Sequence, residues 1–162
     1  MKKNFLASVV DKINNKPKLY RNWLLNYLLG STIKFVGTAG VKCEALSREE
    51  SIWTLKNRKK VRNHIKGIHA AAMGLLAETA TGMVVGMNVP DDRTPVIKSM
   101  RVSYLKRAKG NLRAVAKLSG EQIQQIIDTE KGELTVPVVV TDSEGNEPIE
   151  CEMIWAWTPK RK

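Results

Sequence analysis

The stretch IHAAAMGLLAETATGMVVGMNVP, residues 68–90, decides the fold of this chain. Although 27% of the whole chain is charged, this stretch has a single formal charge, the carboxylate of Glu78. A segment rich in alanine, leucine and methionine favours a helix that is buried on most of its surface. An ionised carboxylate in such a helix is costly unless it has a use, and carboxylates in such settings are candidates for acid or base catalysis. Glu78 is therefore the first candidate for a functional residue.

The same stretch is close in length to the ~20 residues that cross a bilayer. Gly82 and Gly86 also form a G-x-x-x-G pair, which is typical of packed membrane helices. The central position of Glu78 and the modest hydrophobicity of the many Ala, Gly and Thr residues favour a buried helix instead. We predict no membrane span.

The residues before the central stretch predict one helix and two strands. Residues 5–29 favour a helix that Gly30 ends. The apolar stripe of this helix consists of Trp23, Leu24, Tyr27 and Leu28. We interpret the stripe as packing on the sheet or on a partner subunit, with a membrane anchor as the alternative. Between residues 31 and 57 the apolar residues alternate with polar ones, which predicts two strands.

The residues after the central stretch predict four strands and one short helix. Residues 100–104 and 112–118 alternate and predict an antiparallel pair, each strand with one buried face. Ser119 and Gln122 have the spacing of a capping box, which begins a short helix. The remaining strands are residues 134–140, which Pro137 marks as an edge or bulged strand, and residues 149–157.

This order predicts an α+β fold in which an antiparallel sheet covers a single long helix. A chain of 162 residues has room for one sizeable core. We expect an N-terminal helical extension over residues 1–30 and a single domain over residues 31–162.

The composition indicates a basic protein of the cytoplasm. A formal net charge of +11 attracts polyanions, which include nucleic acid, anionic membranes and phosphate-bearing molecules such as coenzyme A. Cys43 and Cys151 lie far apart and form neither a metal-binding spacing nor a disulfide framework, so a reducing compartment fits best. The basic N-terminus has only a short apolar run before Asp11, and we expect no secretion signal.

The segment NHIKGIHAAAMGLLAETATG, residues 63–82, places Asn63, His69 and Glu78 at successive spacings of six and nine residues. With this motif the chain resembles the hotdog-fold acyl-CoA thioesterases of the phenylacetate-pathway type, whose motif has Asn, His and an acidic residue at these positions. The segment YLKRAKGNLRAVAKL, residues 104–118, resembles the strand, hairpin and strand of that family. The resemblance covers residues 32–157 and suggests an uncharacterised side branch.

The resemblance implies an active site at the interface of a homodimer, with pairing of dimers into a tetramer left open. Glu78 would act as general base or as nucleophile, and Asn63 would hold the water or the carbonyl from the opposing subunit. His69 would be a positioning hydrogen-bond donor. The backbone N–H groups of Ala70 and Ala71 would stabilise the oxyanion. Alanines replace the glycine pair of the family here, and Glu replaces its Asp.

Coenzyme A is part of the expected substrate, and we expect neither a separate cofactor nor a metal. Its phosphates need basic partners. The candidates are Arg58, Arg62, Lys106, Arg107 and Lys109, although runs of surface charge are usually just solvated.

Three alternatives stay open. A hotdog protein with alanines after the histidine can bind acyl-CoA or a fatty acyl ligand without hydrolysing it. A nonspecific nucleic-acid-binding protein fits the charge, although no RNP-like strand, zinc spacing or helix-turn-helix pattern is present. Glu78 can also be a structural residue that pairs with a basic side chain where the helix surfaces, and a histidine before an apolar helix is often structural.

Overall fold

The computed structural model describes residues 4–160, so the outermost residues of the predicted extension and of the predicted domain lie outside it. One antiparallel sheet has the strand order β1 (Lys42–Leu46), β2 (Glu50–Leu55), β4 (Leu112–Lys117), β6 (Val138–Asp142). The other has the order β3 (Arg93–Tyr104), β7 (Ile149–Pro159), β5 (Gly132–Thr135). The helices are α1 (Phe5–Asn14), α2 (Lys18–Thr32), α3 (Lys34–Ala39), α4 (Ala70–Gly86) and α5 (Gly120–Asp128), with a 3-10 turn η1 (Lys59–Val61).

The two sheets meet at Pro137. The strand β5 before this proline pairs with β7, and the strand β6 after it pairs with β4. The backbone N–H of Val136 donates to the carbonyl of Met153 at 2.9 Å, so the ladder to β7 continues up to the proline. Pro137 has no N–H to donate and the strand changes partner there. The single strand predicted over residues 134–140 is therefore wrong, because the segment forms two strands, β5 and β6. Among the described strands, each of these two is at an edge of its sheet, as Pro137 predicts.

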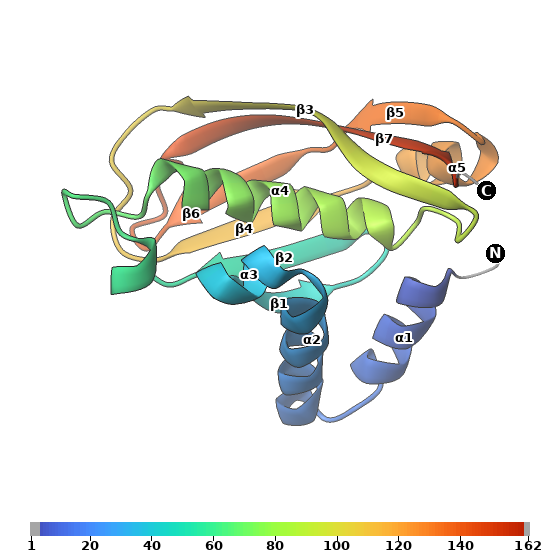
Figure 1. Cartoon of the computed structure of the whole chain (residues 1–162), viewed down its shortest axis with the longest axis horizontal. Helices are drawn as coiled ribbons and strands as arrows, with labels where there is room; N and C mark the ends of the chain where they lie inside the picture. The colour runs from blue at the N-terminus through green and yellow to red at the C-terminus, as the bar shows by residue number, and fades with distance from the viewer. Residues whose placement is uncertain (1–3, 161–162) are drawn as a thin grey trace.

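The long helix α4 lies along the sheet and contacts β2, β3, β4, β6 and β7 (Figure 1). It has 17 residues and is the long helix predicted within residues 68–90. Leu76, Ala77, Ala80 and Val84 are fully buried against the strands. A Cβ at Gly82 would lie 2.6 Å from the ring of Trp155, so this glycine allows helix and sheet to approach closely. Among the described residues, no helix combines the length and hydropathy that crossing a bilayer requires.

The predicted pairing of residues 100–104 with residues 112–118 is wrong. Strand β3 pairs with β7 over its whole length, from Arg93 opposite Pro159 to Tyr104 opposite Ile149. With 12 residues, β3 matches the 11 residues of β7 far better than the six of β4, so the ladder with β7 makes more hydrogen bonds.

The buried face predicted for β3 is wrong as well. Met100 is 52% exposed and Tyr104 is 53% exposed. Strand β4, by contrast, buries Leu112, Ala114 and Ala116 as its alternation predicts. In the described chain β3 is the last strand of its sheet, so one of its edges is unpaired.

The predicted single helix over residues 5–29 is two helices, α1 and α2, separated at Pro17. Proline lacks the N–H that a continuous helix needs, and it ends one helix and begins the next. The prediction also placed the buried stripe on the wrong side of α2. Leu25 and Leu29 are the buried residues of α2, whereas Trp23 and Tyr27 are 64% and 67% exposed.

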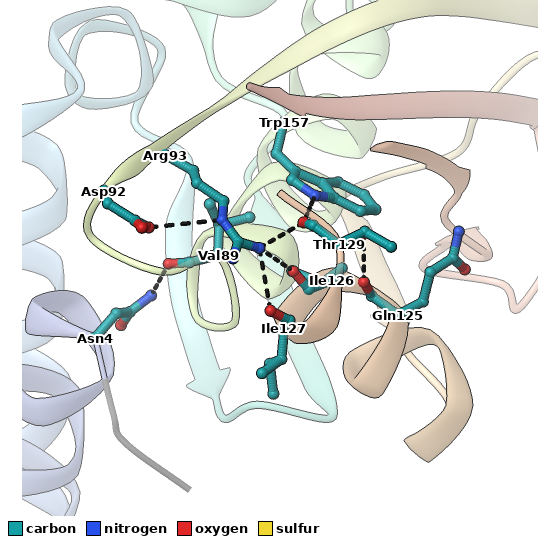
Figure 2. A network of polar contacts seen from close by, with 9 residues as sticks. All are labelled: Asn4, Val89, Asp92, Arg93, Gln125, Ile126, Ile127, Thr129 and Trp157. Atoms are coloured by element: carbon teal, nitrogen blue, oxygen red, sulfur yellow. Dashed lines mark hydrogen bonds and ion pairs between the residues drawn. The ribbon is translucent and has the colours of Figure 1, made fainter. Parts of the chain in front are cut away.

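The N-terminus of α1 is fastened to the C-terminal end of α4. Asn4 caps α1 by accepting a hydrogen bond from the N–H of Ala7 at 2.7 Å. Its amide nitrogen donates to the carbonyls of Val89 at 2.6 Å and of Gly86 at 2.8 Å. Figure 2 shows the contact with Val89 beside the start of β3.

The C-terminal end of α5 is capped by the guanidinium of Arg93 (Figure 2). Its Nη1 donates to the carbonyls of Ile126, Ile127 and Thr129 at 2.9, 3.1 and 2.5 Å. Trp157 donates to the same carbonyl of Thr129 at 2.8 Å. A cation at the negative end of a helix is favourable, and only 12% of this side chain is exposed. Arg93 therefore joins α5 to the sheet.

Replacing Arg93 with methionine is expected to lower the free energy of unfolding by about 2–4 kcal/mol, because three carbonyls lose a charged donor in a mostly buried site. Urea denaturation monitored by circular dichroism measures this change. The exposed Lys131, changed to methionine as a control, is expected to stay within about 0.5 kcal/mol of the parent. Equal midpoints for the two variants would contradict the assigned role of Arg93.

Candidate active site

The first turn of α4 offers one free backbone donor. His69 is the N-cap, and its Nδ1 accepts a hydrogen bond from the N–H of Ala71 at 3.1 Å. The N–H of Ala72 donates to the backbone carbonyl of His69 at 2.9 Å. Within residues 4–160, the N–H of Ala70 has no acceptor. It therefore stays available at the positive end of the helix.

The cap also determines which nitrogen of the neutral His69 ring carries the proton. A nitrogen that accepts a hydrogen bond carries no proton, so the neutral ring holds its proton on Nε2. His69 is exposed. Its Nε2–H can donate outward, while Nδ1 holds the end of the helix.

The loop before α4 is shaped by Asn63. The side-chain Oδ1 of Asn63 accepts hydrogen bonds from the N–H groups of Ile65 at 3.1 Å and Gly67 at 3.0 Å. Lys66, between these two, has a left-handed backbone with φ of 63°. The amide nitrogen of Asn63 donates to none of the described residues, so this side chain keeps one free donor beside the start of α4.

Two side chains from β3 and the segment after it hold this region in place. The hydroxyl of Tyr104 donates to the carbonyl of Ala70 at 3.0 Å. The guanidinium of Arg107 donates to the carbonyl of Ile65 at 2.7 Å. The loop and the first turn of α4 are thereby tied to the rest of the sheet.

Glu78 lies two turns farther along α4 and is half-buried. Burial raises the pKa of its carboxyl above the usual value. No hydrogen bond or ion pair reaches this carboxylate from any described residue, so the basic partner considered as the structural alternative is not found between residues 4 and 160. The carboxylate is poorly solvated and is a stronger base than an exposed one.

The partly exposed residues of α4 form one stripe along the helix. After the exposed Ala70, the stripe consists of Ala71, Ala72, Leu75, Glu78, Gly82 and Gly86. In the view of Figure 1, no other helix or strand lies in front of α4. The residues of this stripe are therefore covered less completely than the rest of the helix.

Glu78 and the free N–H of Ala70 are separated along the helix. Eight residues at about 1.5 Å per residue place the backbones of the two residues about 12 Å apart along the helix axis. A carboxylate and an N–H at this separation cannot both contact one carbonyl group. Within one chain, the two functional groups form separate half-sites.

A cleft of about 500 Å³ opens beside the first turns of α4. It lies between α3, η1 and α4, with Phe35, Val61 and Leu75 among its apolar lining residues and Lys60 and Arg62 among its basic ones. This combination suits a ligand with an apolar part and an anionic part. The sequence pattern singled out neither Phe35 nor Leu75, because the segment of Phe35 was assigned to a strand and Leu75 to the helix core.

The predicted phosphate partners do not converge on one place. Arg62 lines the cleft. Arg58 donates to the carbonyl of Ala39 at 2.8 Å, and Arg107 is engaged with Ile65. Lys109 pairs with Glu144 at 2.8 Å, and this hydrogen bond and charge raise the pKa of the lysine. Lys106 is exposed. No group of three or more metal-ligating side chains is present in the described part of the chain.

The raised pKa of Glu78 predicts a pH-dependent cost to stability. Because the folded state binds this proton more tightly than the unfolded state, the free energy of unfolding falls as pH rises from the ordinary carboxyl pKa through the raised one. Glu78→Gln removes the cost of burying an ionised carboxylate. The variant is expected to melt at a higher temperature than the parent at neutral pH, with the difference vanishing in acid.

Thermal melts over a pH series measure this difference. The exposed Glu130, changed to glutamine, is the control and is expected to leave the melting temperature unchanged at every pH. Coincident melting curves for Glu78→Gln and the parent at neutral pH would mean that the Glu78 carboxylate is fully solvated.

Comparison with known proteins adds a family and a set of similar structures. The chain matches the family described as Domain of unknown function (DUF4442) over residues 21–157. No curated protein matches the sequence.

Several similar solved structures are thioesterases by name. A Pseudomonas aeruginosa protein named as of unknown function and a probable thioesterase is 25% identical, with a TM-score of 0.76 over 85% of this chain and 95% of that one. A Haemophilus influenzae thioesterase is 14% identical, with a TM-score of 0.67 over 83% and 88%. A Staphylococcus aureus thioesterase variant is 16% identical, with a TM-score of 0.66 over 78% and 99%. These similarities confirm the predicted hotdog-type fold and the resemblance to hotdog thioesterases.

Proposed function

Since this chain belongs to the family described as Domain of unknown function (DUF4442), we propose that it is a thioesterase that hydrolyses acyl-CoA. The observation that carries the proposal is the half-buried Glu78 carboxylate, with its raised pKa, on the partly exposed stripe of α4. A base kept ready in a poorly solvated position suits attack by water on an activated acyl group. The thioesterase names of the similar structures support the reaction class.

The complete site is proposed to form between two copies of the chain. Glu78 of one protomer would face the free N–H of Ala70 in its partner, because the two groups lie about 12 Å apart within one chain. A two-fold axis between antiparallel α4 helices provides this arrangement twice. The unpaired edge of β3 is the natural surface for such a contact, since its Val96, Ile97 and Met100 are 45%, 38% and 52% exposed. Two such dimers can pair further into a tetramer.

In the proposed mechanism, the Glu78 carboxylate takes a proton from water as the water oxygen attacks the thioester carbonyl carbon. The carbonyl oxygen becomes an oxyanion, which the N–H of Ala70 and the positive end of α4 stabilise. Collapse of this intermediate expels the coenzyme A thiolate, which takes the proton back from Glu78. The products are a carboxylic acid and a free thiol. Direct attack by Glu78, through an anhydride that water then hydrolyses, is the variant of this mechanism.

The surrounding residues are assigned binding roles in the same proposal. The free amide nitrogen of Asn63 would donate to the water or to the carbonyl oxygen. His69 would position the helix end through Nδ1 and donate outward through Nε2. Lys60 and Arg62 would meet the phosphates of coenzyme A at the edge of the cleft, and its apolar lining would take part of the acyl or pantetheine chain.

Release of free thiol from a panel of acyl-CoA substrates tests the proposal. We expect catalytic turnover for at least one acyl chain, with saturation in substrate concentration. Calorimetry with nonhydrolysable analogues separates the enzyme from a non-catalytic binder. Two features favour the binder: the methyl groups of Ala70 and Ala71, and the N–H of Ala71, which already donates to His69. Tight binding without thiol release across the panel would replace the enzyme with that binder.

A further inference from the structure

Helix α2 presents an aromatic surface that the described chain does not cover. We define this aromatic surface by Leu19, Tyr20, Trp23 and Tyr27, which are 81%, 64%, 64% and 67% exposed. The rings of Trp23 and Tyr27 stack with centroids 5.7 Å apart and planes inclined by 12°. Leu25 and Leu29 on the other side of the helix are buried. The helix is therefore apolar on both sides, and its outer side lacks a partner in the described chain.

The segment that carries the aromatic surface is basic. Residues 12–43 contain six basic residues and no acidic residue. The basic residues are Lys12, Lys16, Lys18, Arg21, Lys34 and Lys42. Lys42 also lines a groove of about 640 Å³ beside Leu19, Trp23 and Tyr27. Exposed tryptophan and tyrosine on a basic segment are typical of a surface that meets anionic lipid headgroups.

The position of α2 leaves this surface accessible. Figure 1 shows α1 and α2 extending away from the sheet and from α4. The charge disfavours a second copy of the chain as the occupant, since a two-fold contact would bring the same basic surface against itself. The apolar side chain of Leu19 adds to the two stacked rings, and such apolar area contributes to partitioning into a bilayer interface.

We propose that the aromatic surface of α2 docks on an anionic membrane, with the helix lying in the plane of the headgroups. Tyr20, Trp23 and Tyr27 would enter the interface, and Lys42 with the other basic residues of the segment would meet the anionic headgroups. This docking is peripheral, in keeping with the absence of a helix fit to cross a bilayer among the described residues. It does not depend on thioester hydrolysis, because binding is measured without substrate.

Tryptophan fluorescence with lipid vesicles tests the proposal directly. Trp23 is the exposed tryptophan, whereas Trp53, Trp155 and Trp157 are 1%, 7% and 0% exposed. We expect the emission to shift to shorter wavelength with vesicles of phosphatidylcholine and phosphatidylglycerol. The shift should weaken as salt is added and should be small with phosphatidylcholine alone. The variant Trp23→Phe should remove the shift while it keeps vesicle binding.

Cosedimentation with the same vesicles gives the size of the effect. Replacing Trp23 and Tyr27 together with serine is expected to lower the partition coefficient about tenfold. Replacing Lys34 and Lys42 together with glutamate is expected to lower it about thirtyfold. The matched controls are Val139→Ser, another exposed apolar residue, and Lys131→Glu, another exposed lysine. Both controls should bind much as the parent does.

Three results would overturn the proposal. The first is the absence of any fluorescence shift or cosedimentation with anionic vesicles. The second is a fluorescence shift that grows with protein concentration in the absence of lipid, which would assign the aromatic surface to a second copy. The third is a shift with single-stranded oligonucleotides but none with vesicles, which would assign it to nucleic acid.

Discussion

Replacing Glu78 with glutamine is expected to reduce the turnover number for acyl-CoA about a thousandfold, the range that general-base catalysis contributes. Glutamine keeps the shape of the side chain but cannot take a proton from water. The half-buried position and the raised pKa make this carboxylate the base in the proposed reaction. Thiol release under saturating substrate measures the change. The Michaelis constant is expected to change little, because the carboxylate acts on water rather than on coenzyme A.

The matched control is again Glu130→Gln, which removes an exposed carboxylate far along the chain from α4. It is expected to turn over like the parent. Binding of a nonhydrolysable analogue shows whether Glu78→Gln keeps its site, and the thermal melts proposed above test whether the variant folds. Turnover of Glu78→Gln within a few-fold of the parent would remove Glu78 from the mechanism.

Replacing Ala70 with proline is expected to lower the turnover number about a hundredfold, the typical loss for one oxyanion donor. Proline removes the free N–H at the first position of α4, where helices accept proline readily. The preceding residue, His69, has φ of −64° and ψ of 140°, which is the extended conformation that a following proline requires. The substitution therefore deletes one donor and leaves the helix in place.

The control for this change is Ala70→Thr, which keeps the N–H and has a side chain of three heavy atoms, as the proline ring does. It is expected to retain most of the activity. A loss as large in Ala70→Thr as in Ala70→Pro would mean that bulk at the helix start, rather than the N–H, limits turnover.

The central helix could be predicted from the sequence because its evidence is local. Composition alone marks residues 68–90 as a buried helix, and the capping box at Ser119 and Gln122 is present as its spacing predicts. Strand partners are set by contacts between distant residues. Alternation in residues 100–104 indicates a strand, but the choice of β7 over β4 depends on matched strand lengths that no single segment contains.

The side of α2 that faces the core was predicted wrongly for a related reason. Trp23 and Tyr27 are more conspicuous in the sequence than Leu25 and Leu29, yet the leucines are the residues that pack. The contact of α2 with β1 and α3 selects the buried side, and periodicity alone does not reveal it. The exposed aromatic surface on α2 is thus a result that only the structure provides.

For the candidate site, the sequence identified candidate residues but not the role of each atom. The spacing of Asn63, His69 and Glu78 is visible in the sequence, and we based their proposed roles on a resemblance. The N–H of Ala71 donates to Nδ1 of His69, and the N–H of Ala70 remains free. This difference depends on the geometry of the helix cap, which the sequence does not show. The contribution of Phe35 to the cleft depends on α3, whose short helix had no recognisable signal in the sequence.

The central claim is that each site combines Glu78 from one copy of the chain with the N-terminus of α4 from the other. Mixing the inactive variants Glu78→Gln and Ala70→Pro, after unfolding and refolding them together, tests this claim most directly. A mixed dimer then contains one site with both groups intact, so equal amounts should recover about a quarter of the parent activity. Activity that stays at the level of the separate variants, although the mixed dimer forms, would contradict the shared site.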